Sequence, residues 1–205
     1  TNNGNGEDTI SFTTMGPASW SPMLTSETLT LNRTESGTTE FTLTVPADAD
    51  AGVKSGMAMV HAFSEACAEQ TSACEYEEHV SFTVTANQIF SITADFYTNE
   101  TGAVKKSVEL EEGQQIQMFA TITNSGNGGD RVAIELIDAP AWIVLNQDTA
   151  LIQKNGGSAD IAIDVRAPAS EATGEHTFQV KATSQDGTTT STTGTLTVTV
   201  QEKST

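Results

Sequence analysis

This sequence has few basic residues and no long apolar run, and each shortage excludes a class of protein. Nine Lys and Arg stand against 27 Asp and Glu, which gives a formal net charge of −18. A chain with this excess of acidic residues is repelled by nucleic-acid phosphates and by anionic lipid. We therefore expect no nucleic-acid partner. No apolar stretch reaches the about 18 residues of a membrane-spanning helix, so we expect no membrane insertion either.

Sequence motifs of catalysis are also absent. The chain contains no Gly-x-Ser-x-Gly turn, no glycine-rich phosphate loop and no His-Glu-x-x-His pair. His176 has no cysteine or elbow serine beside it, and nothing singles out a pair of carboxylates for glycoside hydrolysis. We therefore expect a protein that is not an enzyme.

The chain is instead rich in residues that alternate between apolar and polar, as in Leu196-Thr197-Val198-Thr199-Val200. This period of two is typical of half-buried strands, and no stretch has the period of an amphipathic helix. Turn residues separate the strands every 8–12 residues or so, which predicts Ig-like antiparallel β-sandwiches. The strands expected in the second half are Ile89–Phe96, Ala103–Leu110 (an edge segment), Gln115–Thr123, Arg131–Ile137, Trp142–Leu145, Ala150–Lys154, Ala159–Ala167, Glu175–Ser184 and Thr189–Val200.

The sequence also repeats itself at an offset of 122 residues. Gly4-Asn5-Gly6 matches Gly126-Asn127-Gly128, and the tryptophan and proline that follow match as well, at Trp20 and Trp142 and at Pro46 and Pro168. A repeated module predicts two domains, residues 1–87 and 88–205, joined with almost no linker. The glycines of the repeated turn are expected to supply positive φ.

An insertion distinguishes the first copy from the second. Its last strand aligns at an offset of 116, so the first copy has about six extra residues, which we place in a hairpin insertion at 64–78. That segment holds Cys67 and Cys74, the two cysteines of the chain. A disulfide between them, as in an oxidising compartment, is the favoured interpretation; a reduced pair or a metal site is the alternative.

A deletion is the second difference between the copies. Thr1 corresponds to Thr123. The 35 residues of Gln88–Ile122, which include the first two strands of the second copy, have no counterpart ahead of Thr1. The first sandwich is then expected to expose an apolar strand-acceptor face. Its residues are Ile10, Phe12, Phe41, Leu43 and Phe82. Either a preceding part of a longer polypeptide supplies the strands, or another copy supplies them by β-augmentation, which implies head-to-tail polymerisation.

Candidate metal sites are weak. His61 and His79 are expected on neighbouring strands near several glutamates, where two imidazoles and a carboxylate would suit a divalent cation. A solvated acidic hairpin is the favoured interpretation of these histidines. The turns Asn5–Asp8 and Asn127–Asp130 offer oxygens that suit calcium, although plain turns held by Gly and Asx geometry are favoured. We therefore expect no cofactor, with calcium as the one alternative.

Two further features concern the surface. Trp20 and Trp142 are either paired sugar-binding platforms or core residues at one end of each sandwich, and their exact repetition favours the core. The sequons Asn32-Arg33-Thr34 and Asn99-Glu100-Thr101 make Asn32 and Asn99 candidates for glycosylation.

The residues Thr123-Asn124-Ser125-Gly126-Asn127-Gly128 and their copy, each followed by a tryptophan, resemble a known family. They are similar to the CARDB-type and NPCBM-associated Ig-like repeats of bacterial and archaeal cell-surface proteins, which also have the Val-x-x-Pro step seen at Val165–Pro168. The resemblance covers nearly the whole chain. It implies an Ig-like fold, a cell-surface location and service as a stalk, adhesion spacer or accessory module without shared catalytic residues.

The sequence thus predicts an extracellular structural protein, a subunit or segment of a pilus-like cell-surface filament or of a stalk. Its expected partners are copies of itself or preceding domains of the same polypeptide. Two alternatives remain open: an adhesive or carbohydrate-binding module, and a non-catalytic accessory region of a large secreted enzyme. Exposure of the two tryptophans distinguishes the adhesive module from the structural protein.

Overall fold

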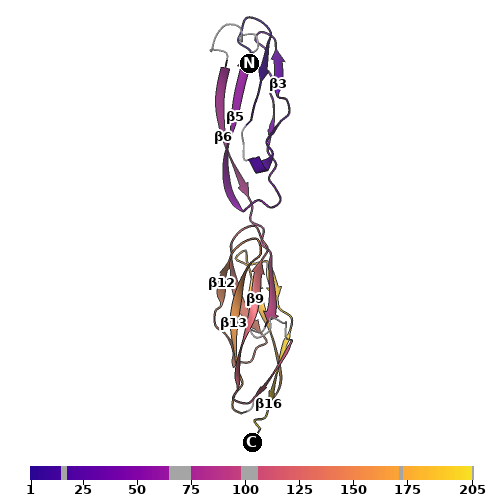
Figure 1. Ribbon diagram of the computed structural model, residues 1–205, viewed down its shortest axis with the longest axis vertical. Coiled ribbons are helices and arrows are strands. Elements are labelled where there is room, and N and C mark those ends of the chain that lie inside the picture. Colours follow the sequence, from indigo (N-terminus) through magenta and orange to yellow (C-terminus); the bar gives the residue numbers. More distant parts are fainter. Residues whose placement is uncertain (15–17, 65–74, 98–105, 171–172, 205) are drawn as a thin grey trace. The chain divides into compact units, whose positions relative to one another are not determined.

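A computed structural model describes the chain apart from residues 15–17, 65–74, 98–105, 171–172 and 205, and the side chains of residues 18, 57–78 and 97 also lie outside the description. The chain divides into two compact units, Thr1–Asn87 and Gln88–Thr205, at the boundary that the repeat places between residues 87 and 88. Both units are all-β, and each is an Ig-like β-sandwich (Figure 1). Each unit is described by itself below.

Unit 2, Gln88–Thr205, consists of two facing sheets. One sheet has the strand order β12-β10-β14-β16-β8, with β15 beside β14, and the other has the order β11-β13-β9-β7. The strands are β7 (Ile92–Tyr97), β8 (Ser107–Glu111), β9 (Gln115–Asn124), β10 (Asp130–Ile137), β11 (Ile143–Leu145), β12 (Thr149–Ile152), β13 (Gly157–Arg166), β14 (Gly174–Thr183), β15 (Thr190–Thr192) and β16 (Leu196–Gln201).

The core of unit 2 is the face that the alternation predicts. Met118 and Ile122 of β9, Ile161 and Ile163 of β13 and Val198 of β16 are all fully buried. Phe178 of β14 meets Phe96 of β7 edge to face, with ring centroids 5.5 Å apart, and this contact joins the two sheets. Each such side chain stabilises the unit by about 1.5–3 kcal/mol relative to exposure.

Two details of unit 2 differ from the sequence prediction. The edge strand β8 pairs with β16 in parallel, whereas every other described pair is antiparallel. The strand predicted at Thr189–Val200 is broken between β15 and β16, because buried Thr193 uses its hydroxyl as well as its backbone. Its Oγ1 accepts a hydrogen bond from the backbone N–H of Val180, while its own N–H donates to the Val180 carbonyl.

Unit 1, Thr1–Asn87, repeats part of this arrangement. Its larger sheet has the order β3-β1-β5-β6, which matches β12-β10-β14-β16, and the pair β2-β4 matches β11-β13. Figure 1 shows β5 and β6 side by side as a long hairpin. The elements are β1 (Asp8–Ser11), the 3-10 turn η1 (Ala18–Trp20), β2 (Met23–Leu24), β3 (Thr28–Leu31), β4 (Phe41–Thr42), β5 (Gly52–Ser64) and β6 (Glu75–Ala86).

Loop hydrogen bonds show how closely the two units correspond. The backbone N–H of Thr44 donates to the Trp20 carbonyl in unit 1, and that of Arg166 donates to the Trp142 carbonyl in unit 2. Each tryptophan therefore takes the same place between its two neighbouring strands, which is the physical basis of the sequence repeat.

The pairing registers also place the extra residues of unit 1. Ser11 and Ala133 are equivalent at the offset of 122. Ser11 pairs with Phe63 of β5, and Ala133 pairs with Thr183 of β14, so Phe63 corresponds to Thr183 at an offset of 183 − 63 = 120. Val80 then corresponds to Leu196, an offset of 196 − 80 = 116. Four of the six extra residues therefore fall between the two strands of the hairpin, and two fall ahead of Phe63 rather than within 64–78.

Candidate functional site

A buried asparagine organises the repeated turn in both units. In unit 2, Asn124 is 1% exposed. Its Nδ2 donates to the carbonyls of Gly128 (2.9 Å) and Ile152 (3.2 Å), and its Oδ1 accepts from the N–H of Gly126 (2.8 Å). Asn2 makes the same three bonds in unit 1, to Gly6, Leu31 and Gly4. The asparagine thus fixes the loop that leads into the first strand of the larger sheet.

The glycines of this turn do not supply positive φ, so that prediction is wrong. Neither Gly126 nor Gly128 is among the described glycines with positive φ. A Cβ on Gly126 would lie 2.2 Å from the carbonyl oxygen of Ile89, and one on Gly128 would lie 2.8 Å from the Gln88 side chain. Gly126 is required because the backbone of Ile89 passes too close for any side chain, whereas a side chain at Gly128 would have to displace the Gln88 side chain.

The acceptor-face residues of unit 1 lie together on the inner faces of its two sheets, and Phe41 packs on Phe82 with ring centroids 5.6 Å apart. All five are only half-buried. Their counterparts in unit 2 are between 0% and 4% exposed, and Val80 at the same face is 51% exposed where Leu196 is 0% exposed. Those counterparts are Val132, Ile134, Ile163, Val165 and Val198.

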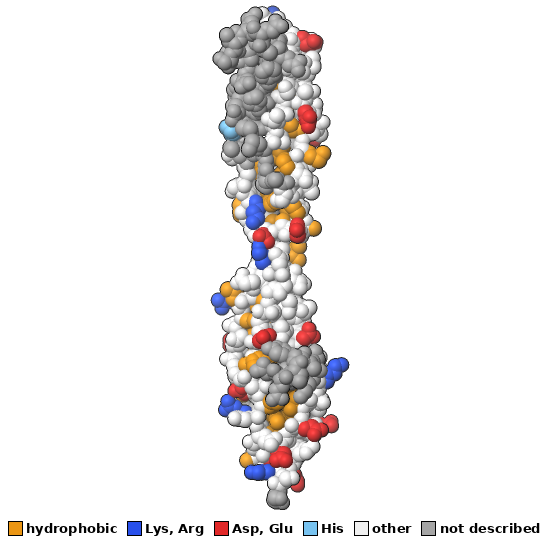
Figure 2. Space-filling model, in the orientation of Figure 1, with side chains coloured by type: hydrophobic (Ala, Val, Ile, Leu, Met, Phe, Trp, Pro, Cys, Tyr) orange, Lys and Arg blue, Asp and Glu red, His pale blue; other side chains and the backbone are white. Residues whose placement is uncertain are grey.

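The difference in burial follows from what covers each face. In unit 2, β7 and β9 contribute Ile92, Ala94, Phe96, Met118 and Ile122 to the same apolar cluster as the counterpart residues. Among the described residues of unit 1, no strand takes the place of β7, β8 or β9. The sequence predicts two strands and the edge segment Ala103–Leu110 without counterparts, and the structure shows strand β8 (Ser107–Glu111) in that segment. Figure 2 shows apolar side chains reaching the surface of unit 1 on the face in view.

Two sheet edges of unit 1 lie open beside this face. In the described part of the chain, β6 ends one sheet and β4 ends the other. In unit 2 the corresponding strands are paired, β16 with β8 over Thr197–Gln201 and β13 with β9 over Gly157–Arg166. Unpaired backbone N–H and C=O groups next to apolar side chains are the usual acceptor for an added strand.

The tryptophans are not exposed platforms. Trp20 is 6% exposed. Trp142 is half-buried, packs against the core cluster and meets His176 edge to face with ring centroids 5.1 Å apart. Both positions fit the core interpretation. A shallow hollow of about 550 Å³ does border Trp20, between Pro46, Asp48 and Val53, but the indole contributes little of its surface.

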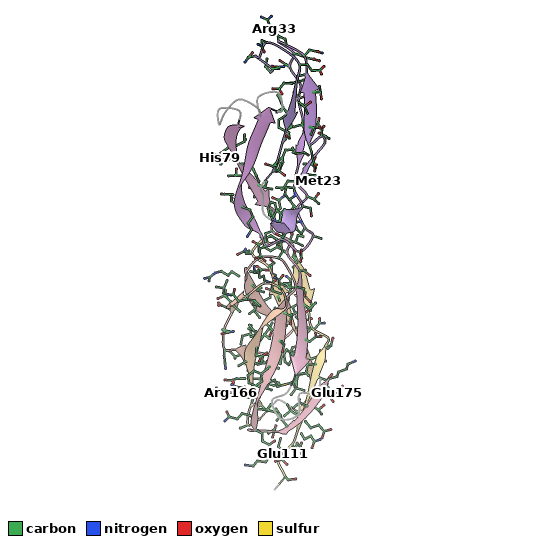
Figure 3. The ribbon with its side chains drawn as sticks, turned by 45° about the horizontal axis from the view of Figure 1, so that its top comes forward. Met23, Arg33, His79, Glu111, Arg166 and Glu175 are labelled. Carbon is green, nitrogen blue, oxygen red and sulfur yellow. The ribbon has the colours of Figure 1, made fainter. Side chains whose placement is uncertain are left out.

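The candidate cation ligands are placed as follows. Pairing of Met59 with His79 and of His61 with Glu77 puts both histidine positions on one face of the β5–β6 hairpin, and His79 is exposed on β6 (Figure 3). Asp130, in one proposed calcium turn, is fully buried and accepts from Ser184 Oγ (2.6 Å) and the Gln185 N–H (3.0 Å). Among the described residues, no group of three or more His, Cys, Asp or Glu is arranged to hold a metal ion.

Of the modification candidates, only Asn32 lies among the described residues. It is exposed in the turn after β3, and its Nδ2 donates to Glu35 Oε2 at 3.0 Å. The cysteines Cys67 and Cys74 and the second sequon residue Asn99 lie outside the described residues.

One carboxyl of unit 2 has a strongly lowered pKa. The pKa of Asp186 falls from 3.8 to about 2, chiefly because the backbone N–H of Thr189 donates to it, with further bonds from the Thr189 hydroxyl and from Thr188. These bonds shape the turn between β14 and β15. Since the pKa is lower in the folded chain, this contribution to stability is present above pH 3.8 and is lost as the pH falls through about 2.

Asp186→Asn is therefore expected to destabilise unit 2 at neutral pH and much less in strong acid. The asparagine keeps one acceptor oxygen but loses the charge that the four donors favour. Urea unfolding of both proteins between pH 7 and pH 2 measures the difference, which should stay constant down to about pH 4 and shrink below it. A difference that is unchanged at about pH 2 would contradict the stated origin of the shift.

Comparison with family models finds no match, and comparison with curated proteins finds none. Among solved structures, domains 4 and 5 of the S-layer protein SbsC match at TM-score 0.33 and 15% identity, covering 83% of this chain and 89% of that one. A protein of unknown function from Porphyromonas gingivalis W83 matches at TM-score 0.33 and 14% identity, covering 99% and 87%. The ASH/PapD-like domain of human CEP192 matches at TM-score 0.38 and 12% identity, covering 49% and 83%.

Likenesses at these identities and scores add nothing to the β-sandwich class that the strands themselves define. Separately, no helix in the described ranges has the length and apolar character needed to cross a bilayer.

Proposed function

We propose that this protein is an extracellular structural module, a segment or subunit of a cell-surface stalk or filament made of β-sandwiches in series. The observation that carries the proposal is the uncovered apolar face of unit 1. At the positions where unit 2 buries its core completely, unit 1 holds half-buried side chains beside two open sheet edges. Such a face suits assembly through added strands rather than a small ligand.

The junction of the two units supports a mechanical role. Strand β6 runs to Ala86, and Gln88 already donates from its Nε2 to the carbonyl of Gly129 inside unit 2. No flexible Gly- or Ser-rich tether separates the units in the sequence. A short junction without a flexible tether suits modules that follow one another directly along a stalk.

Composition and resemblance support the location. The charge of −18 keeps an exposed protein soluble, and the turn motif resembles the CARDB-type and NPCBM-associated repeats of surface proteins. In this role the chain needs no catalytic residue and no cofactor. Glycosylation at Asn32, which lies exposed in a turn, is compatible with it.

The adhesive alternative is less well supported, because a sugar platform requires an exposed ring and Trp20 is buried. The accessory-region alternative differs from our proposal in one measurable property, the presence of a catalytic domain in the native polypeptide.

Immunogold labelling of intact cells with antibodies to residues 88–205 tests the proposal. We expect label on the surface of intact cells, on extended structures, and loss of that label after brief protease treatment. Two further measurements distinguish a polymerising subunit from a segment of a stalk. They are the intact mass of the purified native protein and negative-stain microscopy of the same sample. Filaments of a chain near 21.6 kDa indicate a polymerising subunit, and a longer chain indicates a stalk. Label that requires permeabilised cells would overturn the proposal.

A further inference from the structure

In unit 2, a short segment passes over the repeated turn before β7 begins. The N–H of Ile89 donates to Asn127 Oδ1 at 2.7 Å, and the N–H of Ser125 donates to the Ser91 carbonyl at 2.8 Å. Gly126 and Gly128 are the points of closest approach, to the Ile89 carbonyl and to the Gln88 side chain. The glycines and the asparagine of this turn are thus explained by the segment that leads into β7.

Unit 1 has the same turn residues, but no described segment passes over them. A Cβ on Gly6 would meet nothing within 4 Å, and one on Gly4 would meet only Asn2 Oδ1 of its own turn. Neither glycine is among those with positive φ. Asn5, the counterpart of Asn127, has an exposed side chain for which the described residues provide no hydrogen-bond partner. A turn shaped for a passing segment therefore stands open at the end of the uncovered face.

The first residues of unit 1 fix the direction and register of whatever covers the face. The N–H of Asn2 donates to the Glu35 carbonyl at 2.9 Å, as Asn124 at the end of β9 is paired with Gly157. Thr1 and Asn2 therefore correspond in position to the last two residues of β9, Thr123 and Asn124. A strand that continues from them would run antiparallel to residues 36–44 and would point every second side chain at Phe41 and Leu43.

We propose that the uncovered face of unit 1 is filled by a segment with the pattern of Gln88–Ile122, supplied by the polypeptide that leads into Thr1. Three independent features indicate this occupant: the open glycine turn, the register fixed at Asn2, and the half-buried apolar face. A second copy of residues 1–205 does not fit as the donor, because its own β7 and β9 are buried in unit 2. This inference rests on the proposed stalk function and adds a detail to it. In such a stalk, the first strands of each sandwich follow directly after the preceding sandwich in the polypeptide.

The test is a graft in which a copy of Gln88–Ile122 is fused directly ahead of Thr1, so that the copied Ile122 is followed by Thr1 as it is by Thr123. We expect the urea midpoint of unit 1 to rise by about 1 M or more. We also expect amide exchange of Phe41 and Leu43 to slow at least roughly tenfold, because their N–H groups alternate with those of Glu40 and Thr44, which face β2, and so point to the edge that gains a neighbour. Trp20 fluorescence in a Trp142→Phe background reports unit 1 alone, since each unit has one tryptophan.

The matched control is the same graft with Thr1 deleted, which slips the strand by one residue and turns its apolar side outward. It should leave the midpoint of unit 1 unchanged. A second graft, with Ala at the copied Met118, relieves crowding against Phe82 if the first graft misfolds. Failure of both grafts to exceed the slipped control would overturn the assignment of the face.

A glycine substitution tests the turn directly. Gly6→Ala should not shift the midpoint in residues 1–205, where nothing lies within 4 Å, but should lower it in the graft, where the copied Gln88 fills that space. An equal effect in both proteins contradicts the proposed passage.

The source is tested on the native protein by mass spectrometry of the peptide that spans Thr1. Alternating apolar residues ahead of Thr1 support the inference, and a native chain that starts at Thr1 overturns it. Surface labelling would still stand in that case, so the two failures are distinguishable.

Discussion

Replacing Asn124 by alanine is expected to destabilise unit 2 by about 3–5 kcal/mol, because three hydrogen bonds in a buried site lose their partner at once. The carbonyls of Gly128 and Ile152 and the N–H of Gly126 would remain with no side chain to satisfy them. The bonds to Ile152 and Gly126 are buried and the bond to Gly128 is partly buried, so water cannot replace the amide fully. Urea unfolding followed through Trp142 in a Trp20→Phe background measures the loss.

Asn2→Ala is the matched variant in the first copy. It removes the same three bonds, but two of them, to Gly6 and Gly4, are partly buried, whereas in unit 2 only the bond to Gly128 is. We expect a loss of about 1–2 kcal/mol from unit 1, because water reaches the freed groups more easily. A loss from Asn124→Ala below about 1 kcal/mol would show that the turn is held by other contacts.

Ile163→Ala is expected to cost unit 2 about 2–5 kcal/mol, whereas Phe41→Ala at the equivalent position of unit 1 should cost only about 1 kcal/mol. Ile163 on β13 is 0% exposed, is paired with Met118 of the neighbouring β9 and belongs to the buried core cluster, so its removal leaves a closed cavity. Phe41 is half-buried against Phe82, so its removal exposes little that water does not already reach. The larger side chain thus has the smaller effect.

The same two variants can be measured in the graft, the protein with a copy of Gln88–Ile122 ahead of Thr1. In the protein that carries the copied strands, Phe41→Ala should become as costly as Ile163→Ala, because the ring is then buried from both sides. The difference between the two backgrounds is a coupling energy between Phe41 and the added strands. An unchanged cost would mean that the strands do not contact this face.

Much of unit 2 could be predicted from the sequence because strands show their burial by alternation. Apolar residues alternate with polar ones along β9, β13 and β16, and most of these apolar residues are buried. Alternation does not record which strand lies beside which. The parallel pairing of β8 with β16 and the break at Thr193 therefore depended on contacts between residues far apart in the chain.

The repeated turn shows the same limit at the level of single residues. The sequence showed the glycines of the turn but not why they are needed. The reason is the close approach of Gln88 and Ile89, which lie 38–41 positions away from their partners in the turn. The role of Asn124 was missed as well, although an asparagine repeated at the offset of 122 was the available signal. An amide that bridges three backbone groups leaves no composition or periodicity pattern.

By itself, therefore, the sequence determined the all-β class, the repeat, the inner faces of the strands and the apolar residues of the acceptor face, since these follow from local alternation and from comparison of the chain with itself. The sequence also predicted that this face is exposed, but the tertiary structure alone decided how far each side chain is buried, that Asn2 sets the register of a covering strand, and that Gly4 and Gly6 stand open. Burial and close approach depend on which distant segments meet, and only the folded chain brings those segments together.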